Sequence, residues 1–295
     1  MAINPRGGSL VLSLAVLGAG CVSLPSKPGG PLGGMPVIDV HTHADFDNKL
    51  DPDSKIPNTR EEFLRERARA GIVASISHCQ DETCEGPDPT ADKVFRCGGV
   101  RATPDLTALE AGLRGKRFRC IKVYLGYEKA YAYDAVYDPV YRLAAQYKVP
   151  VVFHTGDTLS DNALVKYADP LTIDEVAVAH RDVTFVIAHL GNPWIESAAE
   201  VAYKNPNVAV EASGMLVGDI KSTVSEDVKE YMIRPVRWAF GYISNPSKFM
   251  FGTDWPLVDM ADYLEVYRKA IPQEHWRAVF HDNAVRVFGL QDAGL

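Results

Sequence analysis

Eight short apolar runs, separated by segments with helical patterning, constrain the fold of this chain more than any other feature. The predicted strands span residues 37–43, 72–77, 95–102, 120–124, 149–154, 183–189, 207–211 and 249–254. Most are continuous runs of β-branched and apolar residues, which is typical of parallel strands covered on both faces. Eight strand–helix units in roughly 260 residues match the size of a (β/α)8 barrel. We therefore predict an α/β fold, a single TIM-type (β/α)8 barrel with parallel strands.

A doubly wound open sheet is the alternative fold, because it shows the same alternation of strands and helices. Such a sheet commonly carries a Gly-rich nucleotide-binding loop after its first strand. Residues 44–57 are instead polar and rich in aspartate. This composition favours the barrel.

The N-terminal segment differs in composition from the rest of the chain. Arg6 precedes an apolar run at residues 10–17, and three small residues then lead to Cys21. This pattern is typical of a secretory signal, and the run is too short to span a bilayer as a helix. Cys21 after small residues resembles a bacterial lipoprotein signal, in which the cysteine is lipidated, although Leu17 lies one position earlier than that signal expects.

We predict a signal segment at residues 1–21, a Pro/Gly-rich tether at 22–35 and a barrel domain at 36–295. The predicted location is the periplasm, with attachment to the membrane if Cys21 is lipidated. The alternative is a cytoplasmic enzyme with an uncleaved N-terminus.

The net charge of the chain disfavours nucleic acid and acidic membranes as partners. The chain has 31 Lys and Arg residues against 38 Asp and Glu residues, for a net charge of -7. A surface of this sign disfavours nucleic acid and acidic membranes. We therefore predict a small-molecule partner and no nucleic acid, and the composition leaves a homo-oligomer open.

Four cysteines remain in the predicted domain once Cys21 is set aside, namely Cys79, Cys84, Cys97 and Cys120. An even number allows three pairings. In an oxidising compartment, one disulfide within the loop between the first and third of them would hold a long insertion in place. Buried thiols are the alternative, and the spacing lacks the paired C-x-x-C pattern of a structural zinc site.

Side chains that commonly bind metals end several of the predicted strands. They are His41, His43, His154, His189 and Asp254. The carboxyl ends of all strands meet at one face of a barrel, and the first two of these residues share one side of their strand. Imidazoles and a carboxylate suit zinc, with iron or manganese as alternatives, and a catalytic site leaves one position open for water. The other histidines occupy less suitable positions and are not assigned, namely His78, His180, His275 and His281.

The same positions resemble a known family. The motifs are DVHTH at 39–43, VFHTG at 152–156, AHLG at 188–191, GTDWP at 252–256 and NAVRVF at 283–288. They are similar to motifs of the amidohydrolase superfamily, in particular the amidohydrolase-related branch typified by aminocarboxymuconate-semialdehyde decarboxylase. The resemblance covers essentially the whole chain after the tether, and the last motif resembles the closing helix of that branch.

The resemblance implies a role for each matching residue. His41, His43 and His154 would bind one divalent metal, most simply Zn²⁺. Asp254 would be a further ligand that also handles a proton. His189 would lie beside the metal-activated water as a general acid–base.

Lys122 bears on the number of metals. It ends the predicted fourth strand, where two-metal relatives carry a carboxylated lysine, and in those relatives the His189 position binds the second metal. The alternatives for Lys122 are a contact with a substrate carboxylate or a structural ion pair. We expect one metal, with a second metal through Lys122 and His189 as the alternative.

These roles predict a metal-dependent hydrolase that uses metal-activated water on a carboxylic ester, lactone or amide bond of a small molecule. The alternative is a metal-dependent non-oxidative decarboxylase, which needs a group to bind the substrate carboxylate, and the sequence does not identify one. A second alternative is an anchored binding protein with a structural metal. We expect loops at residues 45–57, 79–93 and 215–225 to set specificity.

Overall fold

The computed structural model describes residues 30–84 and 88–295. The predicted signal segment at 1–21, with Cys21, and most of the predicted tether lie outside the described residues. In the described part of the tether, Leu32 is buried against the hydrophobic core. No helix in these two ranges has both the length and the apolar character needed to cross a membrane.

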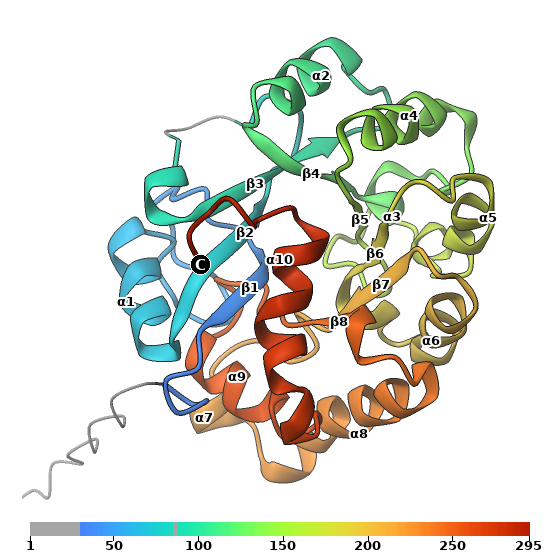
Figure 1. The fold of residues 1–295 in the computed structure, drawn as a ribbon. Coiled ribbons are helices and arrows are strands. Elements are labelled where there is room, and N and C mark those ends of the chain that lie inside the picture. Colours follow the sequence, from blue (N-terminus) through green and yellow to red (C-terminus); the bar gives the residue numbers. More distant parts are fainter. Residues whose placement is uncertain (1–29, 85–87) are drawn as a thin grey trace, which may run out of the picture.

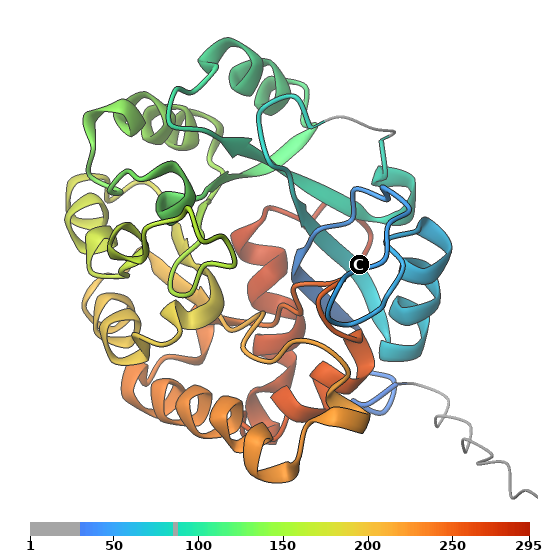
Figure 2. The same cartoon turned by 180° about the vertical axis from the view of Figure 1, so that it is seen from behind.

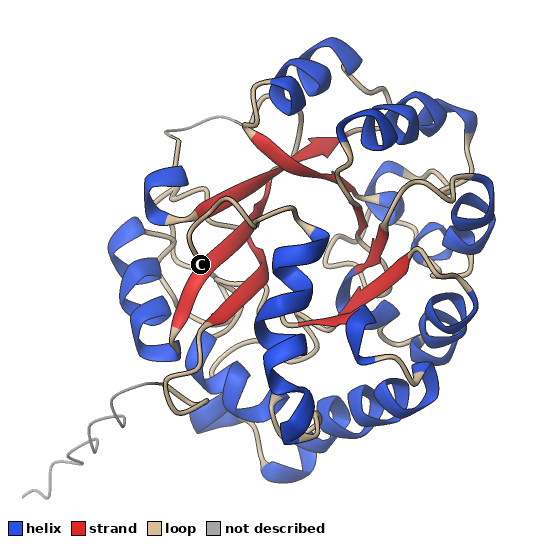
Figure 3. Cartoon of the chain, viewed as in Figure 1, coloured by secondary structure: helices blue, strands red, loops and turns tan. Residues whose placement is uncertain are grey.

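Eight parallel strands form one sheet in chain order, which confirms the predicted architecture. They are β1 (Val37–Thr42), β2 (Ile72–His78), β3 (Val94–Val100), β4 (Phe118–Val123), β5 (Val151–Phe153), β6 (Phe185–Ile187), β7 (Val208–Glu211) and β8 (Phe249–Met250). Figure 3 shows the strands around the centre of the molecule and most helices outside them. This is the layering of a (β/α)8 barrel.

Helices connect the strands and cover the outside of the barrel (Figure 1). They are α1 (Arg60–Ala70), α2 (Leu106–Arg114), α3 (Leu125–Glu128), α4 (Asp138–Tyr147), α5 (Thr172–Ala179), α6 (Ile195–Lys204), α7 (Ile220–Thr223), α8 (Glu226–Ile243), α9 (Met260–Tyr267) and α10 (Asn283–Val287). Local signals place their ends. Thr59 caps α1 by accepting a hydrogen bond from the Glu62 N–H, and Gly71 ends this helix with a φ of 76°.

Backbone hydrogen bonds beyond the end of β8 close the barrel against β1. The N–H of Asp254 donates to the carbonyl oxygen of His41 at 2.8 Å. The N–H of His43 donates to the carbonyl oxygen of Trp255 at 2.7 Å. The two histidines of the first motif and the aspartate of the fourth therefore lie side by side.

The barrel interior is apolar at one end. Its cluster contains side chains from all eight strands, among them Ile38, Phe95, Val152 and Met250. Helix α10 lies across this opening, in front of the strands in Figure 1 and behind them in Figure 2, and its Ala284 joins the cluster. The polar carboxyl ends of the strands are left to form the opposite end.

An irregularity in β1 directs its histidines into the barrel. Val40 belongs to the interior cluster, yet His41 also points inward, where its ring nitrogen meets Lys122. Two consecutive residues do not share a face of a regular strand. The ladder with β2 shifts register between Asp39 and Thr42, and such a bulge changes the alternation by one residue.

Several strands end before the residues that were predicted to end them. β5 ends before His154, β6 ends before His189, and β8 ends before Asp254. His154, His189 and Asp254 therefore lie beyond the ladder, in segments that line the cavity.

Two disulfides are present among the described residues, Cys79–Cys84 and Cys97–Cys120. The first lies in the loop after β2, as expected for a single bridge there. The second was not predicted. Cys97 and Cys120 are direct cross-strand partners in β3 and β4, with Cα atoms 4.4 Å apart. Strand register decides this pairing, so spacing along the chain does not reveal it.

Candidate metal centre

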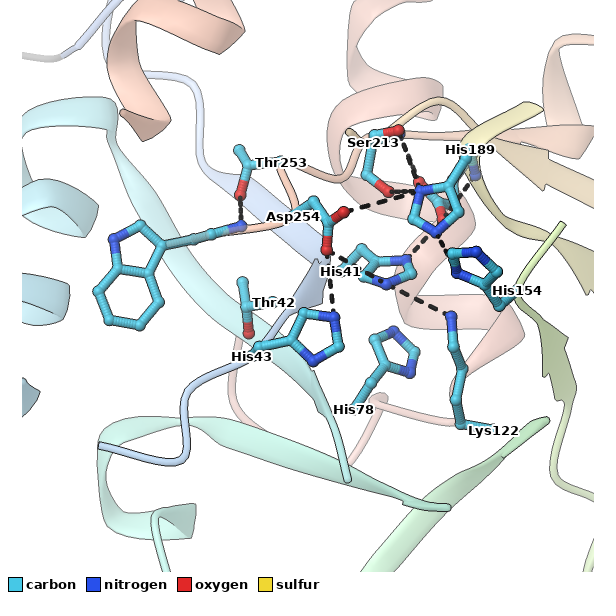
Figure 4. Close-up of polar contacts among 12 residues, drawn as sticks. His41, Thr42, His43, His78, Lys122, His154, His189, Ser213, Thr253 and Asp254 are labelled. Atoms are coloured by element: carbon cyan, nitrogen blue, oxygen red, sulfur yellow. Dashed lines mark hydrogen bonds and ion pairs between the residues drawn. The ribbon is translucent and has the colours of Figure 1, made fainter. Parts of the chain in front are cut away.

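Three side chains from distant parts of the chain meet at the carboxyl end of the barrel. They are His41, His189 and Asp254, and one ligand atom from each lies within 4.8 Å of the others. All three residues are buried. Figure 4 shows their side chains pointing toward one another, with His43 below Asp254 in this view. The rule that strand ends converge therefore correctly brings these four residues together.

A carboxylate oxygen of Asp254 lies at the centre of this group. His43 Nε2 is 3.2 Å from Asp254 Oδ1, and His41 Nε2 is 3.6 Å from the same oxygen. This oxygen is buried and has no hydrogen-bond partner among the described residues. Buried polar atoms are normally satisfied, so an orphaned carboxylate oxygen facing two imidazole nitrogens fits a cation-binding site.

The backbone around the group adopts conformations that are uncommon for side-chain-bearing residues. His189 has a φ of 59° and Asp254 has a φ of 73°. Strained backbone of this kind is concentrated at functional sites. Gly214 allows the close approach, because a Cβ there would lie 2.7 Å from Asp254 Oδ2.

His154 enters the site but contacts His189 rather than Asp254. Its Nδ1 is 3.0 Å from His189 Nε2, and its Nε2 is 2.8 Å from the carbonyl oxygen of Asp157. A carbonyl only accepts, so in a neutral ring the hydrogen lies on Nε2 of His154. His189 Nδ1 lies 3.0 Å from Ser213 Oγ and 3.1 Å from the Ser213 carbonyl oxygen. The role of His154 as a metal ligand stays a prediction.

Burial keeps the imidazoles of His41, His154 and His189 neutral, and the carboxylate of Asp254 is ionised. Burial, with Lys122 as a second cause, lowers the pKa of His41 well below 6.5. Burial likewise lowers the pKa of His154 well below its usual value and that of His189 to about 4. Burial alone would raise the pKa of Asp254, but neighbouring imidazoles and Lys122 outweigh it and lower that pKa. This protonation state is the one that metal binding requires.

Lys122 lies beside the group, inside β4. Its Nζ is 3.4 Å from His41 Nε2. Burial lowers the pKa of Lys122 to about 8, against the opposing influence of Glu211 and Asp254. Lys122 therefore lies next to His41, and its role as a ligand of a second metal stays a prediction.

Two residues at strand ends belong to the site although the sequence analysis did not assign them. The ring of His78 lies 4.1 Å from that of His41, and its Nε2 donates to the carbonyl oxygen of Val40 at 3.0 Å. Glu211 Oε1 accepts a hydrogen bond from His41 Nδ1 at 2.7 Å. Both residues end strands, so the rule that found the other histidines also points to them.

A cavity of about 510 Å³ opens over the group and is lined by His43, His154, His189 and Asp254 among others. All three loops expected to set specificity contribute to its wall, through Asp51, Gln80, Met215 and Val217. Such a volume suits a small molecule.

Further wall residues come from the ends of β3, β4 and β5. Arg101 follows β3, Tyr124 and Tyr127 follow β4, and Asp157 follows β5. Tyr124 is held by a hydrogen bond from its hydroxyl to the carbonyl oxygen of Cys79 at 3.2 Å. The wall therefore combines aromatic rings with one cationic side chain.

Several solved structures share this fold at low sequence identity. An uncharacterised TIM-barrel protein from Bordetella bronchiseptica is 18% identical with a TM-score of 0.65, over 88% of this chain and 100% of that chain. A probable 2-pyrone-4,6-dicarboxylic acid hydrolase from Acinetobacter baumannii is 14% identical with a TM-score of 0.61, over 86% and 99%. The 5-carboxyvanillate decarboxylase from Sphingomonas paucimobilis is 12% identical with a TM-score of 0.58, over 86% and 99%.

No curated protein matches the chain. The family described as Amidohydrolase matches residues 91–290. This match spans most of the chain and includes the motifs that carry His154, His189 and Asp254. The chain therefore belongs to the amidohydrolase family.

Proposed function

We propose that the protein is a metal-dependent hydrolase that acts on a carboxylic ester, lactone or amide bond of a small molecule. One observation carries this proposal: Asp254 Oδ1 is buried and lacks a hydrogen-bond partner within the described residues. It faces nitrogens of His41 and His43 at 3.6 and 3.2 Å, next to the cavity. The membership of the amidohydrolase family supports metal dependence.

The residues that would hold one divalent metal are His41, His43 and Asp254, with a further imidazole from the hydrogen-bonded pair His154 and His189. We propose Zn²⁺, because imidazoles and a carboxylate suit it. When bound, the metal supplies a Lewis acid that polarises a carbonyl group and lowers the pKa of water. A second metal through Lys122 and His189 is the alternative, and metal analysis distinguishes one equivalent from two.

Proton transfer falls to the residues that face both the metal ligands and the cavity. His189 Nδ1 is 3.9 Å from Asp254 Oδ2, and both residues line the cavity. Asp254 is ionised and accepts a proton from the attacking water. His189 is neutral, so it would take this proton from Asp254 and pass it to the leaving group, from a position held by Ser213.

A non-oxidative decarboxylase is the second candidate, and one observation favours it. Arg101 lines the cavity, with its side chain half exposed and a contact of 3.4 Å to Glu128. A guanidinium pairs well with a substrate carboxylate. The similar structures include a probable hydrolase and a decarboxylase, so one fold serves both reactions.

A substrate screen with matched variants tests the proposal. Purified protein carrying one equivalent of zinc is assayed on esters, lactones, amides and aromatic carboxylic acids, with acid release and CO2 release measured in parallel. His41→Ala and Asp254→Ala should each reduce turnover at least about 100-fold. His275→Ala is the control, since His275 packs on the ring of Phe240 at 5.5 Å and does not line the cavity. CO2 release without acid release would favour the decarboxylase. Full turnover in His41→Ala and Asp254→Ala would contradict both the hydrolase and the decarboxylase.

We also propose that the protein is exported and attached to the membrane through Cys21. Two disulfides support export, because disulfides persist in oxidising compartments. Cell fractionation with palmitate labelling tests this. Wild-type protein should carry label in the membrane fraction, and Cys21→Ala should lose the label. Unlabelled wild-type protein in the cytoplasm would contradict the proposal.

A further inference from the structure

Glu211 contacts both sides of the candidate metal centre through one buried carboxylate. We propose that it is a positioning residue, which fixes the ring of His41 and the backbone of His189 so that both face Asp254. This inference rests on the proposed function, because the property it controls is metal binding. Glu211 ends an otherwise apolar strand, β7, and only 1% of its surface is exposed.

Each oxygen of this carboxylate has its own partners. Oε1 accepts a hydrogen bond from His41 Nδ1 at 2.7 Å and another from the N–H of His189 at 3.3 Å. Oε2 accepts from the N–H of Ser213 at 2.7 Å. Glu211 therefore joins β1, the segment after β6 and the segment after β7 inside the barrel.

The contact with His41 sets which ring nitrogen is free. Because a carboxylate only accepts, the hydrogen of a neutral His41 lies on Nδ1, and Nε2 keeps its lone pair. Nε2 is the nitrogen that faces Asp254 Oδ1 at 3.6 Å. Metal-binding histidines are commonly oriented in this way by a carboxylate on their other nitrogen.

The contacts with His189 hold a strained turn. The φ angles of His189 and Leu190 are 59° and 48°, so two consecutive residues with side chains are left-handed. The hydrogen bond from the His189 N–H to Glu211 anchors the start of this turn. Glu211 also fixes Ser213, whose hydroxyl and carbonyl oxygens lie 3.0 and 3.1 Å from His189 Nδ1.

The surrounding chain leaves room for this carboxylate. Gly252 faces it, and a Cβ at that position would lie 2.9 Å from Glu211 Oε2 and 2.8 Å from the Cβ of His41. A buried carboxylate is costly unless several donors satisfy it. Here three N–H donors from three segments do so, and each belongs to a metal-ligand candidate or its immediate support.

Glu211→Gln is the first test, because it keeps the size but makes one of the two positions a donor. In either orientation of the amide, its NH2 group faces at least one N–H of His41, His189 or Ser213. Two donors then face each other, and at least one hydrogen bond is lost. We expect zinc affinity to fall about 10- to 100-fold, measured by competition with a chromophoric chelator. Glu66→Gln is the control, since Glu66 is also buried and accepts from the Met260 N–H, away from the cavity.

Glu211→Ala is the second test, read by ¹⁵N NMR of histidine side chains in the metal-free protein. In the wild type we expect the His41 ring to carry its hydrogen on Nδ1, and in the variant we expect a mixture of both tautomers. This readout does not depend on zinc, so it separates a failure of the inference from a failure of the proposed function.

The outcomes are distinct. Weaker zinc binding in Glu211→Gln with unchanged binding in Glu66→Gln supports the positioning role, provided circular dichroism shows both variants folded. Unchanged zinc affinity and an unchanged His41 tautomer overturn it. Failure of both Glu211 variants to fold, or equal loss in the Glu66 control, also overturns it, because Glu211 then serves the fold rather than the site.

Discussion

Replacing Thr253 with valine is expected to weaken the closure of the barrel between β8 and β1. Thr253 Oγ1 donates to Asp39 Oδ2 at 2.6 Å, and the Thr253 N–H donates to Asp39 Oδ1 at 3.0 Å. The same hydroxyl accepts from the N–H of Trp255 at 3.1 Å. All three residues are buried. Valine has nearly the same shape as threonine, so the change removes both hydroxyl hydrogen bonds while the packing is kept.

The magnitude follows from these two hydrogen bonds. Burial raises the pKa of Asp39 to about 7, so the measurement is made well above that pH, where the carboxylate is charged. A hydrogen bond to a charged carboxylate contributes about 1.5–3 kcal/mol, and a neutral one contributes about 1 kcal/mol. Thr253→Val should therefore lower the free energy of unfolding by about 3 kcal/mol. Thr253→Ser keeps the hydroxyl and removes one buried methyl group, which costs about 1 kcal/mol. The two variants should differ by about 2 kcal/mol, or about 4 °C in Tm for a domain of this size.

Urea unfolding followed by far-UV circular dichroism measures this difference. A chelator is present throughout, so that metal binding does not add to the stability of the folded state. Equal m-values would show that the midpoints report stability alone. If the valine and serine variants unfold within about 0.5 kcal/mol of each other, the hydroxyl bonded to Asp39 does not stabilise the closure and the reasoning is refuted.

Three further predictions concern the site and the pH dependence of stability. Gly214→Ala should weaken zinc binding at least about tenfold in a chelator competition. Position 214 has a φ of +64°, and a Cβ there would lie 2.7 Å from Asp254 Oδ2 and 3.2 Å from His189 Nδ1. Wild-type zinc affinity in this variant would contradict the prediction. Burial raises the pKa of Glu66 from 4.5 to about 7, so its contribution to stability is lost as the pH rises through this interval, by about 3 kcal/mol at most. Glu66→Gln, which keeps an acceptor for the Met260 N–H, should show a flatter dependence of Tm on pH between 4.5 and 7, and parallel curves would contradict the assignment. Removal of metal with dipicolinate should abolish turnover and added Zn²⁺ should restore it, whereas turnover that survives chelation would argue against metal dependence.

Local signals in the sequence were sufficient for much of the fold. The capping residue Thr59 and the glycine at position 71 bracket α1, and Pro139 lies in the first turn of α4. Each of these features involves contacts within a few residues, so the pattern along the chain contains them. The eight apolar runs likewise predict eight strands, and the alternation with helices predicts their parallel order.

The candidate site was predictable where one geometric rule applies. In a barrel all strands point their carboxyl ends to the same face, so residues that end different strands meet. This rule places His41, His43, His189 and Asp254 together before any coordinates are known. Applied without exception, it would also have included Glu211, which ends β7.

By itself, the sequence determined the element order, the barrel and the set of strand-end side chains, because these follow from periodicity and from contacts close in the chain. Only the tertiary structure decided how the members of that set pair. The bulge in β1 that directs His41 inward, the hydrogen bond between His154 and His189, and the disulfide between Cys97 and Cys120 all depend on register between strands. Register is set by packing between residues far apart in the chain, and a one-residue slip moves every side chain to the other face.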